Sequence, residues 1–329
     1  MTPVEQLAQK VLLGQAGAVA RAITLVENRD PRSEELLARL APHQGKAHRI
    51  GLTGPPGAGK STLVDALART ARQHGQTVGV VAVDPSSPFT GGALLGDRVR
   101  MSASLEDPEV FVRSMATRGC LGGLARAAQE AADVLDAMGK NQLYLETVGV
   151  GQSELAIVQS CDTCVVILVP EAGGVVQAMK AGLMEIADVF VVNKCDRPGA
   201  DEMRRQLQEA AGFVKREEGW TPPVVMTTAL ESKGVDDLYA RIEEHWGSLR
   251  AGGHLEKRRE RQLQSRVQDL VRASLEERLW ADEAVLRSLA EATSRLRQGE
   301  VGPHQAACQV WATIRTRLSS DFMIPEEPA

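Results

Sequence analysis

The sequence predicts an α/β protein built on a mostly parallel sheet. Short runs of apolar, often β-branched residues recur from about position 50 to about position 226, as expected for strands that are buried on both faces. Segments with helical spacing of apolar residues alternate with these runs, which is typical of parallel strands joined by helical crossovers. A glycine-rich loop, Gly54–Thr62, lies between the first strand and the first helix of this alternating region. We therefore expect the functional loops to lie at the carboxyl ends of the strands.

Six strands are expected in the core, with helices before and after it. Residues 4–28 have the apolar spacing of one helix, and Ser33 is expected to cap a second helix after the break at Asp30–Pro31. The expected strands are Ile50–Leu52, Val78–Val83, Gln142–Leu145, Val165–Val169, Val189–Val192 and Val224–Met226.

Beyond a break at residues 250–253 the chain becomes charged and helical. An apolar stripe along one side of this segment predicts that it packs against the core or against a second subunit. The stripe consists of Leu263, Val267, Leu270, Val271, Leu275 and Leu279. The expected domains are a helical extension at 1–45, the α/β core at 46–248 and a helical arm at 249–329.

Composition excludes several classes of protein. The net charge of −5 provides no basic field for nucleic acid, and an aromatic content of 3% leaves few platforms for stacking bases. No apolar run reaches the roughly 18 residues of a membrane span. The five cysteines are odd in number and irregular in spacing, which favours a reduced, cytoplasmic setting. Cys161 and Cys164 form a C-x-x-C pair, which we interpret as ordinary buried thiols because no second pair or histidine cluster accompanies them.

The glycine-rich loop fits the phosphate-binding pattern G-x-x-x-x-G-K-[ST]. Its sequence is Gly54-Pro55-Pro56-Gly57-Ala58-Gly59-Lys60-Ser61-Thr62. The glycines let successive backbone N–H groups converge on phosphate oxygens at the positive end of the following helix. Lys60 supplies a charge for the β and γ phosphates, and the Ser61 hydroxyl is a candidate ligand of Mg²⁺. The alternative is a plain glycine turn between a strand and a helix.

Two later strand ends carry residues suited to guanine. Asn193-Lys194-Cys195-Asp196 fits N-K-x-D, in which the Asp196 carboxylate accepts both the ring N–H and the exocyclic amine of guanine. Asn193 is expected to tie this loop to the phosphate loop, and the Lys194 stem to cover the face of the base. Thr228-Ala229-Leu230, after the next strand, resembles the S-A-x segment whose backbone N–H meets the guanine oxygen.

Carboxylates at strand ends are the candidate metal ligands. Glu146, followed three residues later by Gly149, occupies the position where a carboxylate holds Mg²⁺ and a glycine N–H meets the terminal phosphate. Asp84 and Asp97 lie on loops that can also reach the metal, although Asp97 is nearly as well explained as a turn-capping acid.

These motifs together resemble the MeaB/ArgK (MMAA-like) P-loop GTPases, over roughly residues 15–245. The resemblance rests on Gly54–Thr62, Asp84–Ser87, Leu95–Asp97, Glu146–Glu154 and Lys180–Asp188. It implies a GTPase core with bound GTP or GDP and Mg²⁺, an N-terminal helical extension and a C-terminal dimerisation arm. It also implies a homodimeric chaperone of adenosylcobalamin-dependent acyl-CoA mutases, which gates cofactor loading and reactivates the mutase.

The catalytic candidates are Lys60, for charge stabilisation, and Glu154 and Lys180, for orienting the attacking water. One segment departs from the family pattern: Gly173–Gln177 lacks the acidic residues that usually follow the fourth strand, which puts the coupling to a partner in question. Two other functions stay open on the sequence. One is a metallochaperone GTPase of the nickel-insertion type, and the other is a nucleotide-binding scaffold with little turnover.

Overall fold

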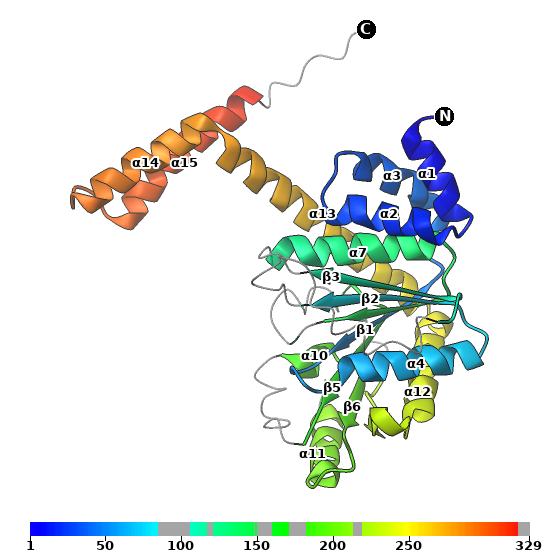
Figure 1. Cartoon of the computed structure of the whole chain (residues 1–329). Coiled ribbons are helices and arrows are strands. Elements are labelled where there is room, and N and C mark those ends of the chain that lie inside the picture. Colours follow the sequence, from blue (N-terminus) through cyan, green and yellow to red (C-terminus); the bar gives the residue numbers. More distant parts are fainter. Residues whose placement is uncertain are drawn as a thin grey trace. The chain divides into compact units, whose positions relative to one another are not determined.

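The computed structural model describes residues 1–84, 106–116, 121–147, 149, 160–170, 182–212 and 219–321. The chain divides into two compact units, Met1–Arg259 and Glu260–Ala329. Helix α13 begins in the first unit and continues into the second as one helix (Figure 1). The functional motifs described by the structure all lie in the first unit.

The first unit is built on a sheet of seven parallel strands in the order β3-β2-β4-β1-β5-β6-β7. All six predicted strands are confirmed, and the parallel α/β fold with them. The seventh strand, β3, lies at the edge of the sheet and was not predicted from the sequence. The strands are β1 (His48–Thr53), β2 (Val78–Asp84), β3 (Val110–Ala116), β4 (Gln142–Glu146), β5 (Thr163–Leu168), β6 (Val189–Asn193) and β7 (Val224–Thr227).

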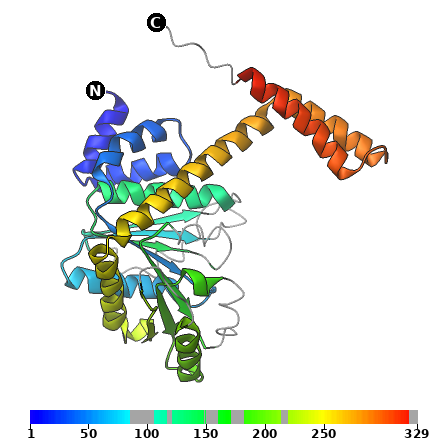
Figure 2. The same cartoon turned by 180° about the vertical axis from the view of Figure 1, so that it is seen from behind.

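Helices cover both faces of this sheet (Figures 1 and 2). One face packs against α7, with α1, α2 and α3 beyond it, and further along against α10 and α11. The other face packs against α4 and α12. The helices of this unit are α1 (Pro3–Leu12), α2 (Ala16–Glu27), α3 (Arg32–Leu40), the short 3-10 helix η1 (Ala41–His43), α4 (Lys60–Gln73), α7 (Leu121–Ala137), α10 (Leu183–Ile186), α11 (Ala200–Gly212), η2 (Ala229–Glu231) and α12 (Val235–Ala251).

The N-terminal region differs from the prediction in two places. The single helix expected over residues 4–28 is wrong, because the chain turns at Gly14, whose φ of +71° lies in the left-handed region. The cap expected at Ser33 is also wrong. Helix α3 begins one residue earlier, and the Asp30 carboxylate accepts the backbone N–H of Arg32 at 2.9 Å. Ser33 is instead buried against the other N-terminal helices.

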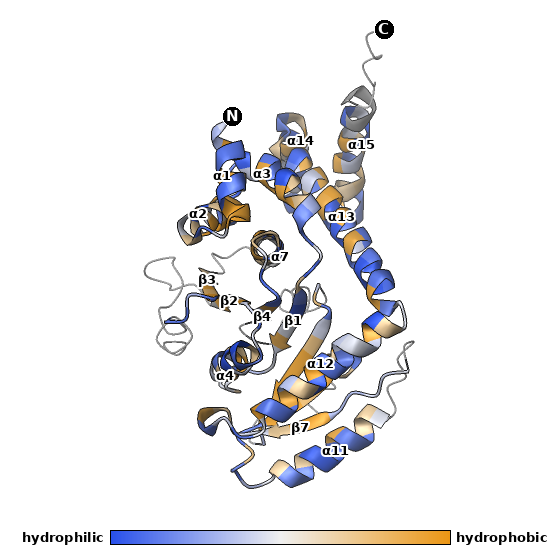
Figure 3. Cartoon of the chain, turned by 90° about the vertical axis from the view of Figure 1, so that its right-hand side faces the viewer, coloured by the Kyte–Doolittle hydropathy of each residue, from blue (hydrophilic) through white to orange (hydrophobic). Residues whose placement is uncertain are grey.

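The second unit contains most of α13 (His254–Ala281), together with α14 (Glu283–Arg297) and α15 (Pro303–Asp321). The predicted break before α13 is confirmed at Gly252–Gly253. Helices α14 and α15 pack together through a small buried cluster formed by Val285, Ala292, Val310 and Ile314. Apolar residues recur along the mostly hydrophilic α13 (Figure 3). Among the helices that the structure describes, none is long and apolar enough to cross a membrane.

Candidate functional site

The predicted site residues gather where the parallel strands end. Because β1 lies between β4 and β5 and its helix begins just beyond it, its end is the natural place for a ligand in such a sheet. Strands β4, β6 and β7 end at the same edge. The structure therefore brings together the phosphate loop, Glu146, the segment from Asn193 and the segment from Thr228.

The loop after β1 requires glycine at two positions. Gly54 has a φ of +153°, and a Cβ atom there would lie 2.1 Å from the carbonyl oxygen of Ile167. Gly59 has a φ of +87°, and a Cβ atom there would lie 2.5 Å from Nδ2 of Asn193. Gly59 is the N-cap of α4, whose first turn contains no acidic residue. The positive end of this helix dipole therefore faces the loop and favours an anion.

Lys60, the first residue of α4, places its side-chain nitrogen inside the loop. Its side chain is buried, and its Nζ donates to the carbonyl oxygens of Gly54 at 2.9 Å and Pro55 at 3.1 Å. A lysine held over backbone carbonyls in this way can offer its ammonium group to a phosphate as a point charge.

Ser61 and Glu146 meet although they are 85 residues apart in the chain. The Ser61 hydroxyl donates to Oε1 of Glu146 at 2.7 Å, and both side chains are buried. Their contact follows from the sheet, in which Leu52 of β1 is paired with Glu146 of β4. A hydroxyl and a carboxylate are hard oxygen donors of the kind that Mg²⁺ prefers, so this pair fits the predicted metal site.

Two buried threonines support this part of the site and were missed from the sequence. Thr53, at the end of β1, donates to the carbonyl oxygen of Gly149 at 2.8 Å, and Thr147 donates to the same oxygen at 3.0 Å. Their hydroxyl groups lie 3.1 Å apart. They fix the backbone of Gly149 beside the phosphate loop, where a Cβ atom on Gly149 would lie 3.9 Å from Pro56. The sequence signal for this arrangement is a threonine at the end of β1 and another directly after β4.

Asn193 connects the three loops through its side-chain amide. Its Nδ2 donates to the carbonyl oxygen of Ala58 in the phosphate loop at 2.7 Å. Its Oδ1 accepts from the Thr227 hydroxyl at 3.0 Å and from the backbone N–H of Ala229 at 3.1 Å. The side chain is 1% exposed, so these bonds are shielded from water. The expected tie between the N-K-x-D loop and the phosphate loop is present in the structure.

The remaining base-binding candidates lie beside one another on the two last loops. Lys194 has a φ of +56°, so the loop after β6 passes through the left-handed region just before Asp196. The Thr228 hydroxyl contacts Oδ1 of Asp196 at 3.4 Å. The Asp196 carboxylate is exposed, and Leu230 is 88% exposed, so both are open to a ligand from solvent.

Several predicted residues lie outside the described part of the chain. They are Asp97, Glu154, Lys180 and the departing segment Gly173–Gln177. Asp84 closes β2 at the same edge as the other candidates, but its side chain is also outside the described part.

The C-x-x-C pair has the character of buried thiols. Cys161 and Cys164 are at most 1% exposed, and neither forms a disulfide. Burial, with a smaller contribution from the neighbouring Asp162, raises the pKa of the Cys161 thiol to about 12. Because a thiolate is the form that binds metal, this environment disfavours a metal role for Cys161. Across the described residues, no group of three or more His, Cys, Asp or Glu side chains is arranged to hold a metal ion.

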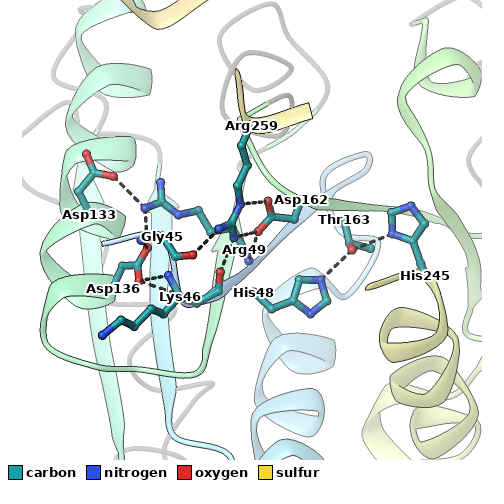
Figure 4. A network of polar contacts seen from close by, with 11 residues as sticks. Gly45, Lys46, His48, Arg49, Asp133, Asp136, Asp162, Thr163, His245 and Arg259 are labelled. Carbon is teal, nitrogen blue, oxygen red and sulfur yellow. Dashed lines mark hydrogen bonds and ion pairs between the residues drawn. The ribbon is translucent and has the colours of Figure 1, made fainter. Parts of the chain in front are cut away.

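A second polar cluster lies at the opposite edge of the sheet, where the strands begin (Figure 4). Arg49 of β1 forms ion pairs of 2.9 Å with both Asp133 and Asp136 on α7. Arg259, near the start of α13, binds Asp162 through two nitrogens at 2.8 Å each. Asp162 in turn accepts the backbone N–H of Arg49 at 2.9 Å. This cluster attaches the start of α13 to the sheet and shares no residue with the site at the other edge.

Asp188, just before β6, forms the neighbouring attachment. Its carboxylate lies 2.7 Å from Arg258 and accepts the backbone N–H of Cys164 at 2.8 Å. Burial raises the pKa of this carboxyl group, but Arg258 and His245 together bring its pKa below the ordinary value. The buried acid is therefore ionised and depends on Arg258 for its stability.

Comparison with known proteins agrees with this geometry. The chain matches the family described as "Methylmalonyl Co-A mutase-associated GTPase MeaB" over residues 19–284. A provisionally named GTPase of Pyrococcus abyssi is 46% identical over 315 residues, covering 94% of this chain and 97% of its own. The mitochondrial methylmalonic aciduria type A homolog of mouse is 32% identical over 332 residues, covering 95% of this chain and 80% of its own.

A solved structure gives the same result for the fold. The crystal structure of an LAO/AO transport system kinase superposes with a TM-score of 0.75 at 27% identity, covering 96% of this chain and 99% of that one. The GTPase ArgK of Escherichia coli is 33% identical over 312 residues, covering 92% of this chain and 94% of its own. The resemblance inferred from the motifs is thereby confirmed, and the relatives from Pyrococcus abyssi and Escherichia coli are both named as GTPases. The chain is a P-loop GTPase that belongs to the MeaB family of methylmalonyl-CoA mutase-associated GTPases.

Proposed function

We propose that this protein is a Mg²⁺-dependent GTPase that acts as a chaperone of an adenosylcobalamin-dependent acyl-CoA mutase. In this role it gates loading of the mutase with its cofactor and reactivates the damaged enzyme. The observation that carries the proposal is the buried Asn193 side chain, which joins the phosphate loop to the guanine-reading loops. A site linked in this way can transmit the presence of a nucleotide from one loop to the next.

Phosphate binding is assigned to the backbone of Gly54–Thr62, to Lys60 and to the Gly149 N–H. Guanine binding is assigned to Asp196, with Lys194 covering the base and residues Thr228–Leu230 completing its pocket. The exposure of Asp196 and its position beside Thr228 support this assignment.

Magnesium is assigned to Ser61 and Glu146, with Asp84 or Asp97 completing the set. The 2.7 Å contact between Ser61 and Glu146 supports this assignment, because a metal ligated by these groups needs both oxygens at one place. The bound ion supplies neutralisation of the charge that develops on the phosphates. The substitutions Ser61→Ala and Glu146→Gln test these two ligand assignments. Each should raise the Mg²⁺ concentration that half-saturates GTP hydrolysis. Asp65, a buried acid of α4 that pairs with Arg69, is a matched control as Asp65→Asn.

Catalysis is assigned to Lys60 for charge stabilisation, and to Glu154 and Lys180 for orienting water. Phosphoryl transfer depends mainly on positioning and electrostatics, so a strong general base is not required. The assignments of Glu154 and Lys180 rest on the family resemblance.

A mutase is the proposed partner, supported by the family description and by the name of the mouse relative. The test is the rate of GTP hydrolysis by the protein alone and with each member of a panel of purified adenosylcobalamin-dependent acyl-CoA mutases. One mutase should raise the rate, and Lys60→Ala should abolish both the basal and the stimulated rate. Lys46→Gln, which changes an exposed lysine away from the site, should leave both rates intact. If no mutase changes the rate, the chaperone proposal is wrong and a scaffold with little turnover is favoured.

The arm, residues 249–329, is proposed to form a homodimer. Four apolar side chains at every fourth position of α13 are exposed in the single chain: Leu263 at 60%, Val267 at 58%, Val271 at 53% and Leu275 at 40%. Such a stripe is typical of a helix that buries one face against another helix. Light scattering should therefore give twice the mass of the chain, and Val267→Glu with Val271→Glu should give the monomer. Leu13→Glu, at an apolar residue that is 74% exposed in the first unit, is the matched control and should stay dimeric.

A cytoplasmic setting is part of the proposal. All cysteines within the described residues are free thiols, which supports a reducing compartment: Cys161, Cys164, Cys195 and Cys308.

A further inference from the structure

The N-terminal helices form a cavity that is open to solvent, and none of the candidate nucleotide-site residues lines it. Its volume is about 330 Å³, and it lies among α1, α2 and the start of α3. This volume is at the lower end of the range found for small-molecule sites. The cavity is therefore large enough for a small ligand.

Three cationic side chains line this cavity, and no acidic side chain does. They come from three different helices: Lys10 from α1, Arg21 from α2 and Arg32 from α3. The whole chain carries a net charge of −5, so a cavity whose charged lining residues are all positive differs from the chain as a whole. All three residues are exposed, so they present this positive charge to solvent.

Two of these cations have no counter-ion among the residues that the structure describes. Arg32 is paired with Asp30, whose two oxygens it binds at 2.8 and 2.7 Å. Within the described part of the chain, neither Lys10 nor Arg21 forms an ion pair or a side-chain hydrogen bond. Their ammonium and guanidinium groups are therefore available to a ligand that enters the cavity.

The rest of the wall is largely apolar. Leu7 lies one turn before Lys10 on α1, and Ala18 and Leu25 lie one turn on either side of Arg21 on α2. All three apolar side chains are partly buried against the N-terminal core. The cavity thus offers two cations beside an apolar wall.

We propose that this cavity binds a small organic anion, with its carboxylate or phosphate head between Lys10 and Arg21 and its apolar part against Leu7, Ala18 and Leu25. The ligand class follows from the charges and the apolar wall together, because an inorganic ion would leave the apolar surface unused. The site is independent of the nucleotide loops, and its test does not depend on GTP hydrolysis.

The test uses the full-length protein saturated with GDP, so that added phosphates cannot enter the nucleotide site. Calorimetric titration with ethyl, butyl and hexyl phosphate and with hexanoate measures how much the anionic head and the alkyl tail of the ligand each contribute to affinity. Affinity should rise with chain length, by up to about fourfold for each added methylene that is buried. Hexanol, which has the same chain without the charge, should bind at least about tenfold more weakly than hexyl phosphate.

The variants separate this site from nonspecific charge. Lys10→Gln and Arg21→Gln should each weaken hexyl phosphate binding by about fivefold, and by about 25-fold together. Lys46→Gln removes the same charge from an exposed position outside the cavity and should leave the affinity unchanged. GDP affinity should be the same in all four proteins, which reports that each is folded.

Several results would overturn the inference. They are the absence of hexyl phosphate binding at millimolar concentration, equal binding of hexanol, and a loss with Lys46→Gln as large as that with Arg21→Gln. Binding of acidic peptides without binding of alkyl phosphates or hexanoate would also contradict the inference, because the cavity would then bind a protein partner.

Discussion

Replacing Asn193 by alanine tests how the site is assembled. The side chain makes three hydrogen bonds, to the Ala58 carbonyl at 2.7 Å, to the Thr227 hydroxyl at 3.0 Å and to the Ala229 N–H at 3.1 Å. The threonine hydroxyl can rotate to a new partner, but the two backbone groups are left unsatisfied in a buried place. At about 1–3 kcal/mol for each group, Asn193→Ala should lower the free energy of unfolding by about 2–6 kcal/mol.

Nucleotide binding should fall for a separate reason. Without the amide, the phosphate loop and the loops after β6 and β7 are no longer held together before the ligand arrives, so binding must also order them. We expect the dissociation constant for GDP to rise by at least about tenfold, which corresponds to roughly 1.4 kcal/mol. Urea unfolding and calorimetric titration with GDP measure the two effects on the same protein.

Asn141→Ala is the matched control at the other edge of the sheet. Oδ1 of Asn141 accepts from the backbone N–H of Thr77 at 2.9 Å and from its hydroxyl at 3.0 Å, and the residue is exposed. Its loss should cost about 0.5–1.5 kcal/mol and leave GDP affinity unchanged. A folded Asn193→Ala protein that binds GDP within about twofold of the wild type would refute the reasoning, as would an equal loss of affinity in Asn141→Ala.

Three further predictions concern the loop, the thiols and the arm. Gly59→Ala should weaken GDP binding far more than Gly57→Ala. Both glycines have a positive φ (+87° and +76°), but only at Gly59 would a Cβ atom collide with Asn193. Equal effects of the two substitutions would contradict this steric explanation. Iodoacetamide at pH 8 should alkylate the exposed Cys308 and leave Cys161 unmodified until the protein is unfolded. Cys161 should not react because its pKa is raised to about 12, so that little thiolate is present. Peptide mass mapping measures the modification of each cysteine. Arg258→Met should lower the free energy of unfolding at pH 7 by about 3–5 kcal/mol, because it removes the main counter-ion of the buried Asp188 carboxylate. In the wild type, the lowered pKa of Asp188 stabilises the fold above the unfolded pKa of about 3.9 and this contribution is lost on acidification through the folded pKa. In Arg258→Met, burial without the arginine should raise the pKa of Asp188. The loss of unfolding free energy relative to the wild type should therefore be smaller at pH 5 than at pH 7. Urea unfolding at both pH values measures this, and an equal loss at both would contradict the prediction.

The strands were predictable where their burial is complete. β5 and β6 are buried at every position, and their continuous apolar runs are visible in the sequence. β3 was missed because it is an edge strand whose residues are mostly half-buried. Its run is interrupted by Arg113, which pairs with Glu27 of α2 at 2.6 Å, a contact 86 residues away in the chain. Pattern alone cannot distinguish such a strand from a loop.

The motifs expected to bind nucleotide could be identified in the sequence because each lies within a few consecutive residues, Gly54–Thr62 and Asn193–Asp196. The supporting contacts of Thr53 and Thr147 are not local, since they depend on β1 and β4 being neighbours in the sheet. The same applies to Arg259 and Asp162, whose pairing spans 97 positions and leaves no pattern in the sequence.

The most direct test of the account is whether Asp196 reads guanine. Asp196→Asn replaces the carboxylate, which accepts two N–H groups of guanine, by an amide that can donate to the extra carbonyl of xanthine. The dissociation constants of GDP, XDP and ADP should be measured by calorimetry on the wild type and on this variant. If Asp196 reads guanine, GDP binding should weaken by about 10²–10³-fold in the variant while XDP binding strengthens. Unchanged preference for GDP over XDP in a folded variant would contradict it, because guanine would then be recognised elsewhere.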